Sequence, residues 1–134
     1  MGKTSDNTIG LALSDEETLQ RVMTAVTDPA RRYRNDPGHP EICNIYSLHQ
    51  YFNALQLDDI AEQCRSARIG CVDCKVLLAE GINSALKPFR QRRAVLAAEP
   101  RYVTDVLTDG AHRAQLIARE TISEVKQRMG LETP

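Results

Sequence analysis

The sequence predicts an all-α fold in which helices pack as an antiparallel, bundle-like domain over residues 14–134. Three observations favour this class. Apolar residues recur at the three- and four-residue spacing of helix faces, a capping motif precedes the first of these patterns, and no run of strict apolar–polar alternation indicates a strand. Residues 1–13 form a short polar segment ahead of this domain.

The first helix is expected to begin at a capping box. Ser14 can accept a hydrogen bond from the amide of Glu17, while the Glu17 side chain reaches back to the Ser14 amide. Behind this box an apolar stripe recurs at helical spacing and comprises Leu19, Val22, Met23 and Val26. Asp28-Pro29 is expected to end the helix. Residues 29–40, with three prolines and three arginines, are expected to form an exposed connector.

The remaining helices follow from the same periodicity. They are expected over residues 42–54, 57–66, 72–98, 102–107 and 111–129. The long fourth helix should present Leu78, Ile82, Leu86 and Phe89 to the core, and Pro88 is expected to kink it. Gly110 is expected to separate the last two helices, and Gly130 to stop the last one.

Length, charge and hydropathy restrict the class of protein. A chain of 134 residues fits one domain and can bury a core. Its 17 basic and 18 acidic side chains nearly cancel, so any nucleic-acid contact must come from a local patch. No apolar run is long enough to cross a bilayer, and the first residues lack the layout of a secretory signal. A cytoplasmic protein without membrane contact is therefore expected.

Four cysteines need an explanation, because a cytosolic compartment keeps thiols reduced and disfavours disulfides. Cys43, Cys64, Cys71 and Cys74 follow the spacing C-x20-C-x6-C-x2-C. The last two lie at the expected start of the long helix, at the spacing that lets two thiolates reach one ion or cluster. Four thiolates suit both tetrahedral zinc and an iron–sulfur cluster. The alternative is that the cysteines are small core residues.

The amino-terminal segment carries a short motif of a lysine among small residues. Met1, Gly2, Lys3 and Thr4 resemble the mobile ATP loop of class I aminoacyl-tRNA synthetases, which usually reads Lys-Met-Ser-Lys-Ser. Gly2 and Thr4 stand where that motif has serine, and its leading lysine would precede residue 1. The resemblance implies that these four residues bind ATP and that Lys3 is catalytic. An ammonium on a flexible stem neutralises the charge that builds on the departing pyrophosphate. The alternative is a solvated tail.

Further segments resemble one family of these enzymes, the tryptophanyl-tRNA synthetases. They are Val26-Thr27-Asp28-Pro29, Asp36-Pro37-Gly38, Ile45-Tyr46, Asp73-Cys74-Lys75, Leu78-Ala79-Glu80, Pro88 with Arg90 and Arg92, and Met129-Gly130-Leu131. The match spans nearly the whole chain in the order and spacing of the family. The resemblance implies a carboxyl-terminal part of such an enzyme. Residues 1–13 would be a remnant of its catalytic domain, and residues 14–134 its helical tRNA anticodon-binding domain.

The resemblance also implies what the whole enzyme does. It would activate tryptophan with ATP and Mg2+ and transfer it to tRNA(Trp), and it would be a homodimer. Because the sequence lacks the nucleotide-binding half of the family, these residues alone are expected to be inactive. Two rivals remain. One is a stand-alone, metal-bound helical module that binds RNA without ligase activity, and the other is a plain helical protein with buried thiols.

The resemblance extends to the cysteines. A subset of bacterial tryptophanyl-tRNA synthetases has a four-cysteine motif in this domain that holds a 4Fe-4S cluster. The last three cysteines of this chain match its spacing, while the first interval is two residues shorter. The resemblance therefore favours a 4Fe-4S cluster bound by the four cysteines, in a structural role, with zinc as the alternative.

Basic side chains flank the expected metal ligands. Arginine suits phosphates and splayed bases, and the family meets the anticodon with this domain, so Arg65, Arg68 and Lys75 are expected to bind tRNA. A solvated helix face is an equal alternative for these three. It is the favoured interpretation for a second basic group, Lys87, Arg90, Arg92 and Arg93. Three histidines show no metal or triad spacing and are assigned no role: His39, His49 and His112.

Overall fold

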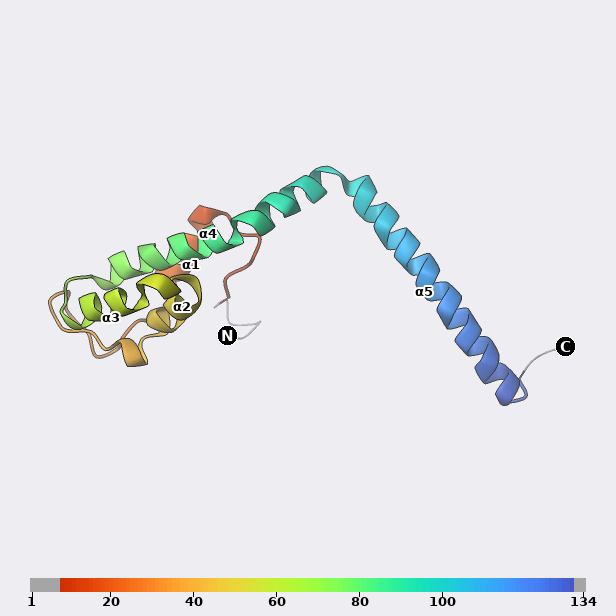
Figure 1. The fold of residues 1–134 in the computed structure, drawn as a ribbon, viewed down its shortest axis with the longest axis horizontal. Helices are drawn as coiled ribbons and strands as arrows, with labels where there is room; N and C mark the ends of the chain where they lie inside the picture. The colour runs from red at the N-terminus through yellow and green to blue at the C-terminus, as the bar shows by residue number, and fades with distance from the viewer. Residues whose placement is uncertain (1–7, 132–134) are drawn as a thin grey trace. The chain divides into compact units, whose positions relative to one another are not determined.

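The structure, a computed structural model, describes residues 8–131, and every regular element in that range is helical (Figure 1). The all-α prediction is therefore confirmed. The α-helices are α1 (Asp15–Thr24), α2 (Asn44–Phe52), α3 (Leu57–Arg65), α4 (Cys71–Ala98) and α5 (Pro100–Arg128). Two short 3-10 helices, η1 (Pro40–Ile42) and η2 (Ala54–Gln56), flank α2. Over the same residues, no helix combines the length and the hydropathy needed to span a membrane.

The chain divides into two compact units, residues 1–91 and 92–134. The first unit contains α1, α2, α3 and most of α4. The second contains the end of α4 together with α5, which buries none of its residues. The expected division at residue 13 falls inside the first unit and stays a prediction.

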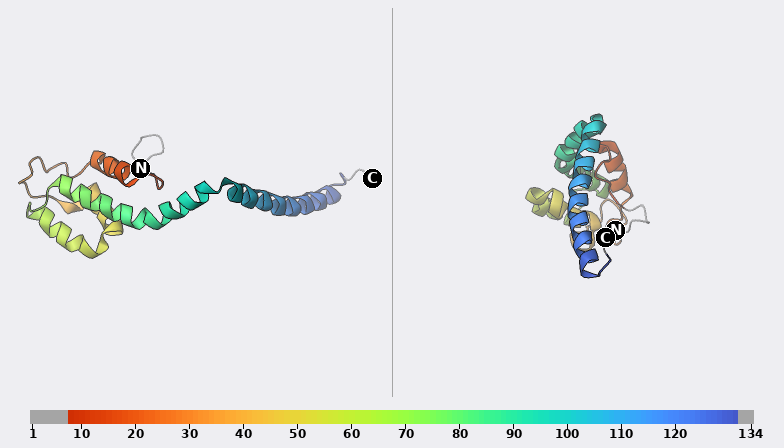
Figure 2. Two further views of the ribbon diagram at one scale, coloured as in Figure 1. Left: turned by 90° about the horizontal axis from the view of Figure 1, so that it is seen from above. Right: turned by 90° about the vertical axis from the view of Figure 1, so that its right-hand side faces the viewer.

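Helix α4 is the central helix of the first unit, with α1 along one side of it. Lys75 Nζ donates to the carbonyl of Met23 at 2.7 Å, and Asn83 Nδ2 donates to the carbonyl of Asp15 at 3.1 Å. The start of α1 therefore lies beside the middle of α4 and its end beside the start of α4, so the two helices are antiparallel. Figure 2 shows α4 running between α1 and α3 in its left-hand view.

A single apolar cluster holds these helices together. Its buried members are Val22, Cys43, Ile45, Leu78, Ala79 and Ile82. The inward positions expected for Leu78 and Ile82 are thus confirmed. Two other expectations were wrong. Val26 is 67% exposed because α1 ends at Thr24, and Phe89 is 45% exposed because it lies past Leu86, the last residue of α4 packed against the cluster.

The capping box is present: Ser14 Oγ accepts from the Glu17 amide at 3.1 Å, and Glu17 Oε2 accepts from the Ser14 amide at 2.7 Å. The expected break at Gly110 was wrong, because α5 continues through that residue. A glycine inside a helix costs only about 1 kcal/mol, which the hydrogen bonds of the surrounding turns offset. The helix expected over residues 42–54 corresponds to α2, which is shorter. The 3-10 helices η1 and η2 take the place of its two ends.

Candidate functional site

The four cysteines line one small cavity in the first unit. Cys43 is the residue before α2, Cys64 lies in the last turn of α3, and Cys71 and Cys74 lie in the first turn of α4. The cavity has a volume of about 20 Å³, and its other walls are Thr27, Asp28, Arg31, Ile45 and Ile69. Segments distant in sequence therefore bring these thiols together, as the spacing predicted. Their role as metal ligands stays a prediction.

The thiols influence one another electrostatically. Burial raises the pKa of Cys74 to about 12, and the neighbouring Cys43, Cys64 and Cys71 add to that shift. Burial also raises the pKa of Cys64, again with contributions from Cys43 and Cys71. Thiols this close repel as thiolates, so they ionise together only when a cation compensates their charge.

Arg31 places a positive charge at this cavity. Its Nη2 donates to the carbonyls of Arg34 at 2.6 Å and Ile69 at 2.9 Å, and its Nη1 lies 4.0 Å from Cys64 Sγ. Its Nε is buried and has no hydrogen-bond partner. A buried guanidinium nitrogen without an acceptor is costly. Arg31 lines the cavity, so its positive charge suits an anionic group there.

Gly38 allows the connector to approach Cys64. A Cβ built on Gly38 would overlap Cys64 Sγ and lie 3.4 Å from the Cys64 carbonyl. The Gly38 amide donates to that same carbonyl at 3.0 Å. Any larger residue at position 38 would push Cys64 from its place in the cavity wall.

Asp28 holds the two ends of the connector together. Its buried carboxylate accepts from the Ala30 amide at 2.8 Å, from the His39 amide at 2.8 Å and contacts His39 Nδ1 at 2.9 Å. Burial acts to raise the pKa of Asp28, but the hydrogen bonds from His39 and Ala30 outweigh it and lower the pKa. The connector that the sequence indicated as simply exposed is therefore fixed at both ends, next to the cysteines.

His49 contacts one of the four cysteines, although the sequence pattern indicated no role for it. It is fully buried, and its Nε2 lies 3.2 Å from the Cys74 carbonyl and 3.4 Å from Cys74 Sγ. Burial lowers the pKa of His49, which favours the neutral form of the ring. One signal could have indicated its burial: it follows Ile45 by four residues and so shares the inward face of α2.

The residues expected to contact tRNA all have partners within the fold. Arg65 pairs with Glu41, and Arg68 pairs with Glu62. Both arginine side chains are more than half exposed, so these pairs are weak and a phosphate can displace them. Lys75 instead donates to the Met23 carbonyl, which ties α4 to α1. Arg65 and Arg68 are therefore more available than Lys75 for contact with a nucleic acid.

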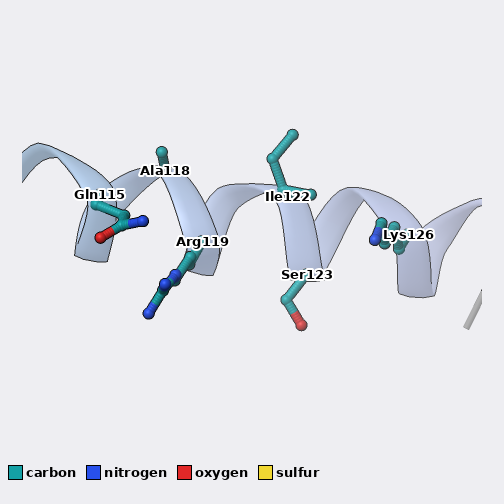
Figure 3. A pocket seen from close by; sticks show the side chains of 6 residues that line it. All are labelled: Gln115, Ala118, Arg119, Ile122, Ser123 and Lys126. Atoms are coloured by element: carbon teal, nitrogen blue, oxygen red, sulfur yellow. The ribbon is translucent and has the colours of Figure 1, made fainter.

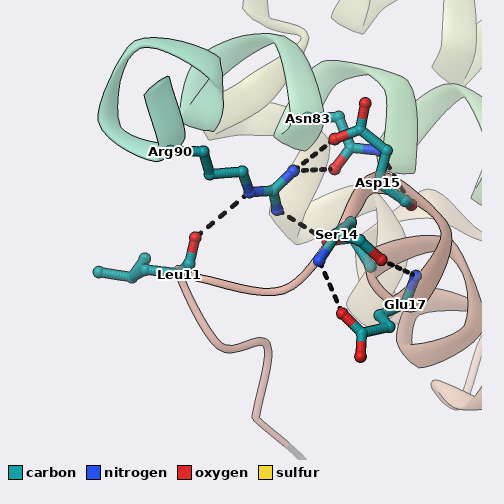
Figure 4. Close-up of polar contacts among 7 residues, drawn as sticks. Leu11, Ser14, Asp15, Glu17, Asn83 and Arg90 are labelled. Atoms are coloured by element: carbon teal, nitrogen blue, oxygen red, sulfur yellow. Dashed lines mark hydrogen bonds and ion pairs between the residues drawn. The ribbon is translucent and has the colours of Figure 1, made fainter. Parts of the chain in front are cut away.

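Arg90 differs from the other members of the second basic group, which lie exposed on α4 as expected. Its side chain is only 15% exposed and binds the segment before α1 (Figure 4). Arg90 Nε donates to the Leu11 carbonyl at 3.3 Å, Nη1 to Asp15 at 2.6 Å and Asn83 at 2.8 Å, and Nη2 to Thr18 Oγ1 at 2.8 Å. The solvated-face expectation was wrong for this residue.

The ATP-loop residues Met1, Gly2, Lys3 and Thr4 lie outside the described residues. The segment over residues 9–14 is anchored to the helices. Ile9 packs against the apolar cluster, and the Leu11 carbonyl accepts from Arg90. Ile9 and Leu11 thus attach this segment to the helical unit.

A second hollow lies on α5 (Figure 3). It is lined by Gln115, Ala118, Arg119, Ile122, Ser123 and Lys126. All six side chains are exposed and come from one helix, so the hollow is a surface feature without the enclosing walls of a ligand site.

Comparison with known proteins identifies the family. The family model described as tRNA synthetases class I (W and Y) matches residues 1–87. The chain therefore belongs to the class I tRNA synthetases of the tryptophan and tyrosine group.

Individual relatives agree with this assignment. The tryptophan–tRNA ligase of Deinococcus radiodurans is 42% identical over 97% of the chain, and that of Thermotoga maritima is 38% identical over 98%. The chain spans 40% of the length of each. A crystal structure of tryptophanyl-tRNA synthetase from Campylobacter jejuni, complexed with ADP and tryptophan, matches 98% of the chain with a TM-score of 0.87 at 26% identity. That match covers 41% of the Campylobacter chain.

Proposed function

We propose that this chain is part of a tryptophan–tRNA ligase that activates tryptophan with ATP and Mg2+ and transfers it to tRNA(Trp). One observation supports this most strongly: sequence and backbone both match tryptophan-specific members of the family over at least 97% of the chain. The chain spans about 40% of those relatives, so the activity belongs to the whole enzyme. The ligase relatives disfavour a stand-alone RNA-binding module. A homodimer, implied by the resemblance, stays a prediction.

The reaction has two balanced steps. The tryptophan carboxylate attacks the α-phosphorus of ATP, forming tryptophanyl-adenylate as the bond to pyrophosphate breaks. A hydroxyl of the terminal tRNA ribose then attacks the tryptophanyl carbonyl, and AMP leaves as the ester forms. In the first step Lys3 would neutralise the charge that develops on pyrophosphate. Mg2+ would share that charge.

Lys3 provides the test of the first step. In the complete enzyme, Lys3→Ala is expected to lower tryptophan-dependent pyrophosphate exchange by about 100- to 1,000-fold, the loss typical when a transition-state charge partner is removed. Lys3→Arg keeps the charge and is expected to retain part of the rate. The 134 residues alone are expected to be inactive. Exchange by the isolated chain, or full activity of Lys3→Ala, would contradict the proposal.

We propose that Arg65 and Arg68, with a smaller part for Lys75, contact the phosphates or bases of the tRNA anticodon region. Two exposed arginines beside the cysteine cavity support this. Arg65→Ala and Arg68→Ala are each expected to weaken tRNA(Trp) binding and to reduce the salt slope by about 0.7 to 0.9 for each phosphate that is no longer bound. Arg113→Ala is a matched control, because Arg113 is an exposed arginine paired with Asp109 on α5. An equal effect of the control would refute the assignment.

We also propose that the four cysteines hold a metal centre, with a 4Fe-4S cluster favoured over zinc. The donor set fits, because Cys43, Cys64, Cys71 and Cys74 line one cavity, and Arg31, which also lines it, adds a positive charge. Either occupant with four thiolates carries net negative charge, which suits Arg31. When bound, the centre would supply cross-linking of α2, α3 and α4, and not redox catalysis.

Two observations bear on the choice between the two proposed centres. Among residues 8–131, no three His, Cys, Asp or Glu side chains are placed as ligands of a single ion. In a 4Fe-4S cluster each thiolate binds a different iron, so the sulfurs need not approach a common point. A zinc ion requires all four sulfurs at about 2.3 Å. The cavity of about 20 Å³ is small for a cluster, which favours a single ion, so these two observations point to different centres.

Metal analysis of anaerobically purified protein decides between these outcomes. Iron and sulfide in equal amounts, with visible absorption, indicate the cluster. Stoichiometric zinc without sulfide indicates the mononuclear site and revises the metal. Protein that takes up neither, even after reconstitution with iron and sulfide, shows that the cysteines are buried thiols and overturns the proposed centre without affecting the proposed ligase.

A further inference from the structure

The ring of His49 is held in one orientation against the first turn of α4. Asn53 Nδ2 lies 3.1 Å from His49 Nδ1 and 3.0 Å from the Leu77 carbonyl. A carbonyl only accepts hydrogen bonds, so it is the amide nitrogen of Asn53 that must face Leu77. The second hydrogen of that nitrogen then points at His49 Nδ1. Nδ1 is therefore the acceptor, and the proton of the neutral ring sits on Nε2.

The position of Asn53 depends on a glycine in α4. A Cβ built on Gly81 would overlap Asn53 Oδ1 and lie 3.1 Å from the Phe52 carbonyl. The absence of a side chain at Gly81 lets the end of α2 approach α4 closely enough for Asn53 to reach both Leu77 and His49. The direction of the His49 proton is thus set by packing on the far side of the ring from the cysteines.

The Nε2–H of His49 has two acceptors on one residue, the Cys74 carbonyl at 3.2 Å and Cys74 Sγ at 3.4 Å. A thiol sulfur is a weak acceptor, whereas a thiolate is charged and accepts more strongly. Both acceptors lie within reach of one N–H, and a metal-bound sulfur, which is charged, would be the stronger acceptor of the two. Because His49 is fully buried, no water competes for that bond.

We infer that His49 is a positioning residue of the metal centre: its Nε2–H donates to the Cys74 sulfur, stabilises that thiolate as a ligand and withdraws electron density from it. This inference rests on the proposed metal centre. A hydrogen bond to a ligating sulfur makes the sulfur a weaker electron donor and raises the reduction potential of an iron–sulfur cluster. The sulfur of Cys64 has its own donor in Arg31 Nη1, so the two sulfurs are held by different kinds of group.

The test compares three variants of the full chain, each reconstituted anaerobically with iron and sulfide. His49→Leu removes the donor at similar volume. His49→Gln replaces it with an amide that can donate from nearly the same place. Ile82→Val is the matched control, because it removes one methylene from the core at a residue of α4 that does not line the cysteine cavity. The measured quantity is the midpoint potential of the cluster, and the visible absorption of the cluster reports its oxidation state during the titration.

His49→Leu is expected to shift the midpoint potential to a more negative value, His49→Gln to restore most of the shift, and Ile82→Val to leave the wild-type potential. If the wild type holds zinc, the probe is cobalt(II), and His49→Leu is expected to move the thiolate-to-cobalt absorption to lower energy. If His49→Leu does not fold, Asn53→Ala replaces it in the test. This variant removes the group that holds the ring proton on Nε2, so part of the population can carry the proton on Nδ1. The potential or the cobalt absorption is then expected to shift in the same direction by a smaller amount.

A wild type that binds a centre, with His49→Leu and Asn53→Ala leaving its potential or absorption unchanged, overturns the role of His49 and leaves the metal centre intact. A wild type that binds no centre removes the basis of both. These results are distinguishable because metal content and potential are measured on the same samples.

Discussion

Arg90 and Asp15 form an ion pair that joins the first residue of α1 to the second half of α4, with Arg90 Nη1 at 2.6 Å from Asp15 Oδ1. The two residues are 75 positions apart in sequence. The same guanidinium also binds Leu11, Thr18 and Asn83. One mostly buried side chain therefore fixes Leu11 and the start of α1 to α4.

Arg90→Ala is expected to loosen that attachment. Hydrogen bonds to a charged, poorly exposed group contribute more than neutral ones, so the variant should lose about 2 kcal/mol of unfolding free energy. Hydrogen exchange of the amides of residues 9–14 should rise more than that of α4. Arg92→Ala, at an exposed position on the same helix, is the control. Equal exchange in residues 9–14 for the two variants would show that Arg90 does not anchor the segment.

Substitution by alanine is expected to change protein stability in opposite directions at Gly81 and at Gly110. Alanine usually stabilises a helix interior by about 1 kcal/mol over glycine. A Cβ at Gly110 meets nothing within 4 Å, so Gly110→Ala should stabilise the protein. A Cβ at Gly81 overlaps Asn53, so Gly81→Ala should instead destabilise it by about 2 kcal/mol through overpacking. Thermal unfolding of both variants measures the two signs. A stabilising Gly81→Ala would show that α2 and α4 are less tightly packed.

The parts of the fold that the sequence predicted correctly depend on local signals. The capping box at Ser14 and the apolar spacing of Leu78 and Ile82 act within one or two turns, and both were confirmed. The errors arose where tertiary context or helix length decides. Gly110 does not stop α5, since the flanking turns continue the hydrogen-bond ladder, and Phe89 is exposed because the packed part of α4 ends before it.

The site was predictable only in part for a related reason. The cysteine spacing indicated that four thiols converge, because two of them share one helical turn. The polar residues around them were not predictable. Arg31 reaches Ile69 across 38 positions, and His49 reaches Cys74 across 25. Neither contact follows a periodicity or a motif, so only the packed structure places these two side chains at the cavity.

Glu17 gives the first helix a defined pH dependence. Hydrogen bonds from the backbone and the side chain of Ser14 lower the pKa of Glu17 below its ordinary value of 4.5. A lowered folded-state pKa means that the carboxylate stabilises the helix at pH above 4.5 and that this stabilisation is lost as pH falls through the folded pKa. The stability difference between wild type and Glu17→Gln should therefore shrink on acidification. Denaturant unfolding across that range measures it.

The control for this pH dependence repeats the Glu17→Gln comparison in protein that carries Ser14→Ala. That substitution keeps the Glu17 carboxylate but removes the hydroxyl that binds the Glu17 amide, at a cost of about 1 kcal/mol for the lost cap. In that background Glu17→Gln should show a weaker pH dependence. An unchanged dependence would mean that the Ser14 hydroxyl does not contribute to it and that the Ser14 amide alone is its source.

Substitution of Arg31 is expected to affect stability differently in metal-loaded and in metal-free protein. Without an occupant, its buried Nε has no partner, so Arg31→Met loses the bonds to the Arg34 and Ile69 carbonyls but also removes an unsatisfied donor. With an anionic metal centre present, the same variant also loses the compensating charge. We expect the destabilisation by Arg31→Met to be about 2 kcal/mol larger in metal-loaded protein than in metal-free protein. Denaturant unfolding of both forms, with and without anaerobic reconstitution, measures this difference. An equal effect in both forms would show that Arg31 is a structural residue of the connector and does not stabilise the centre.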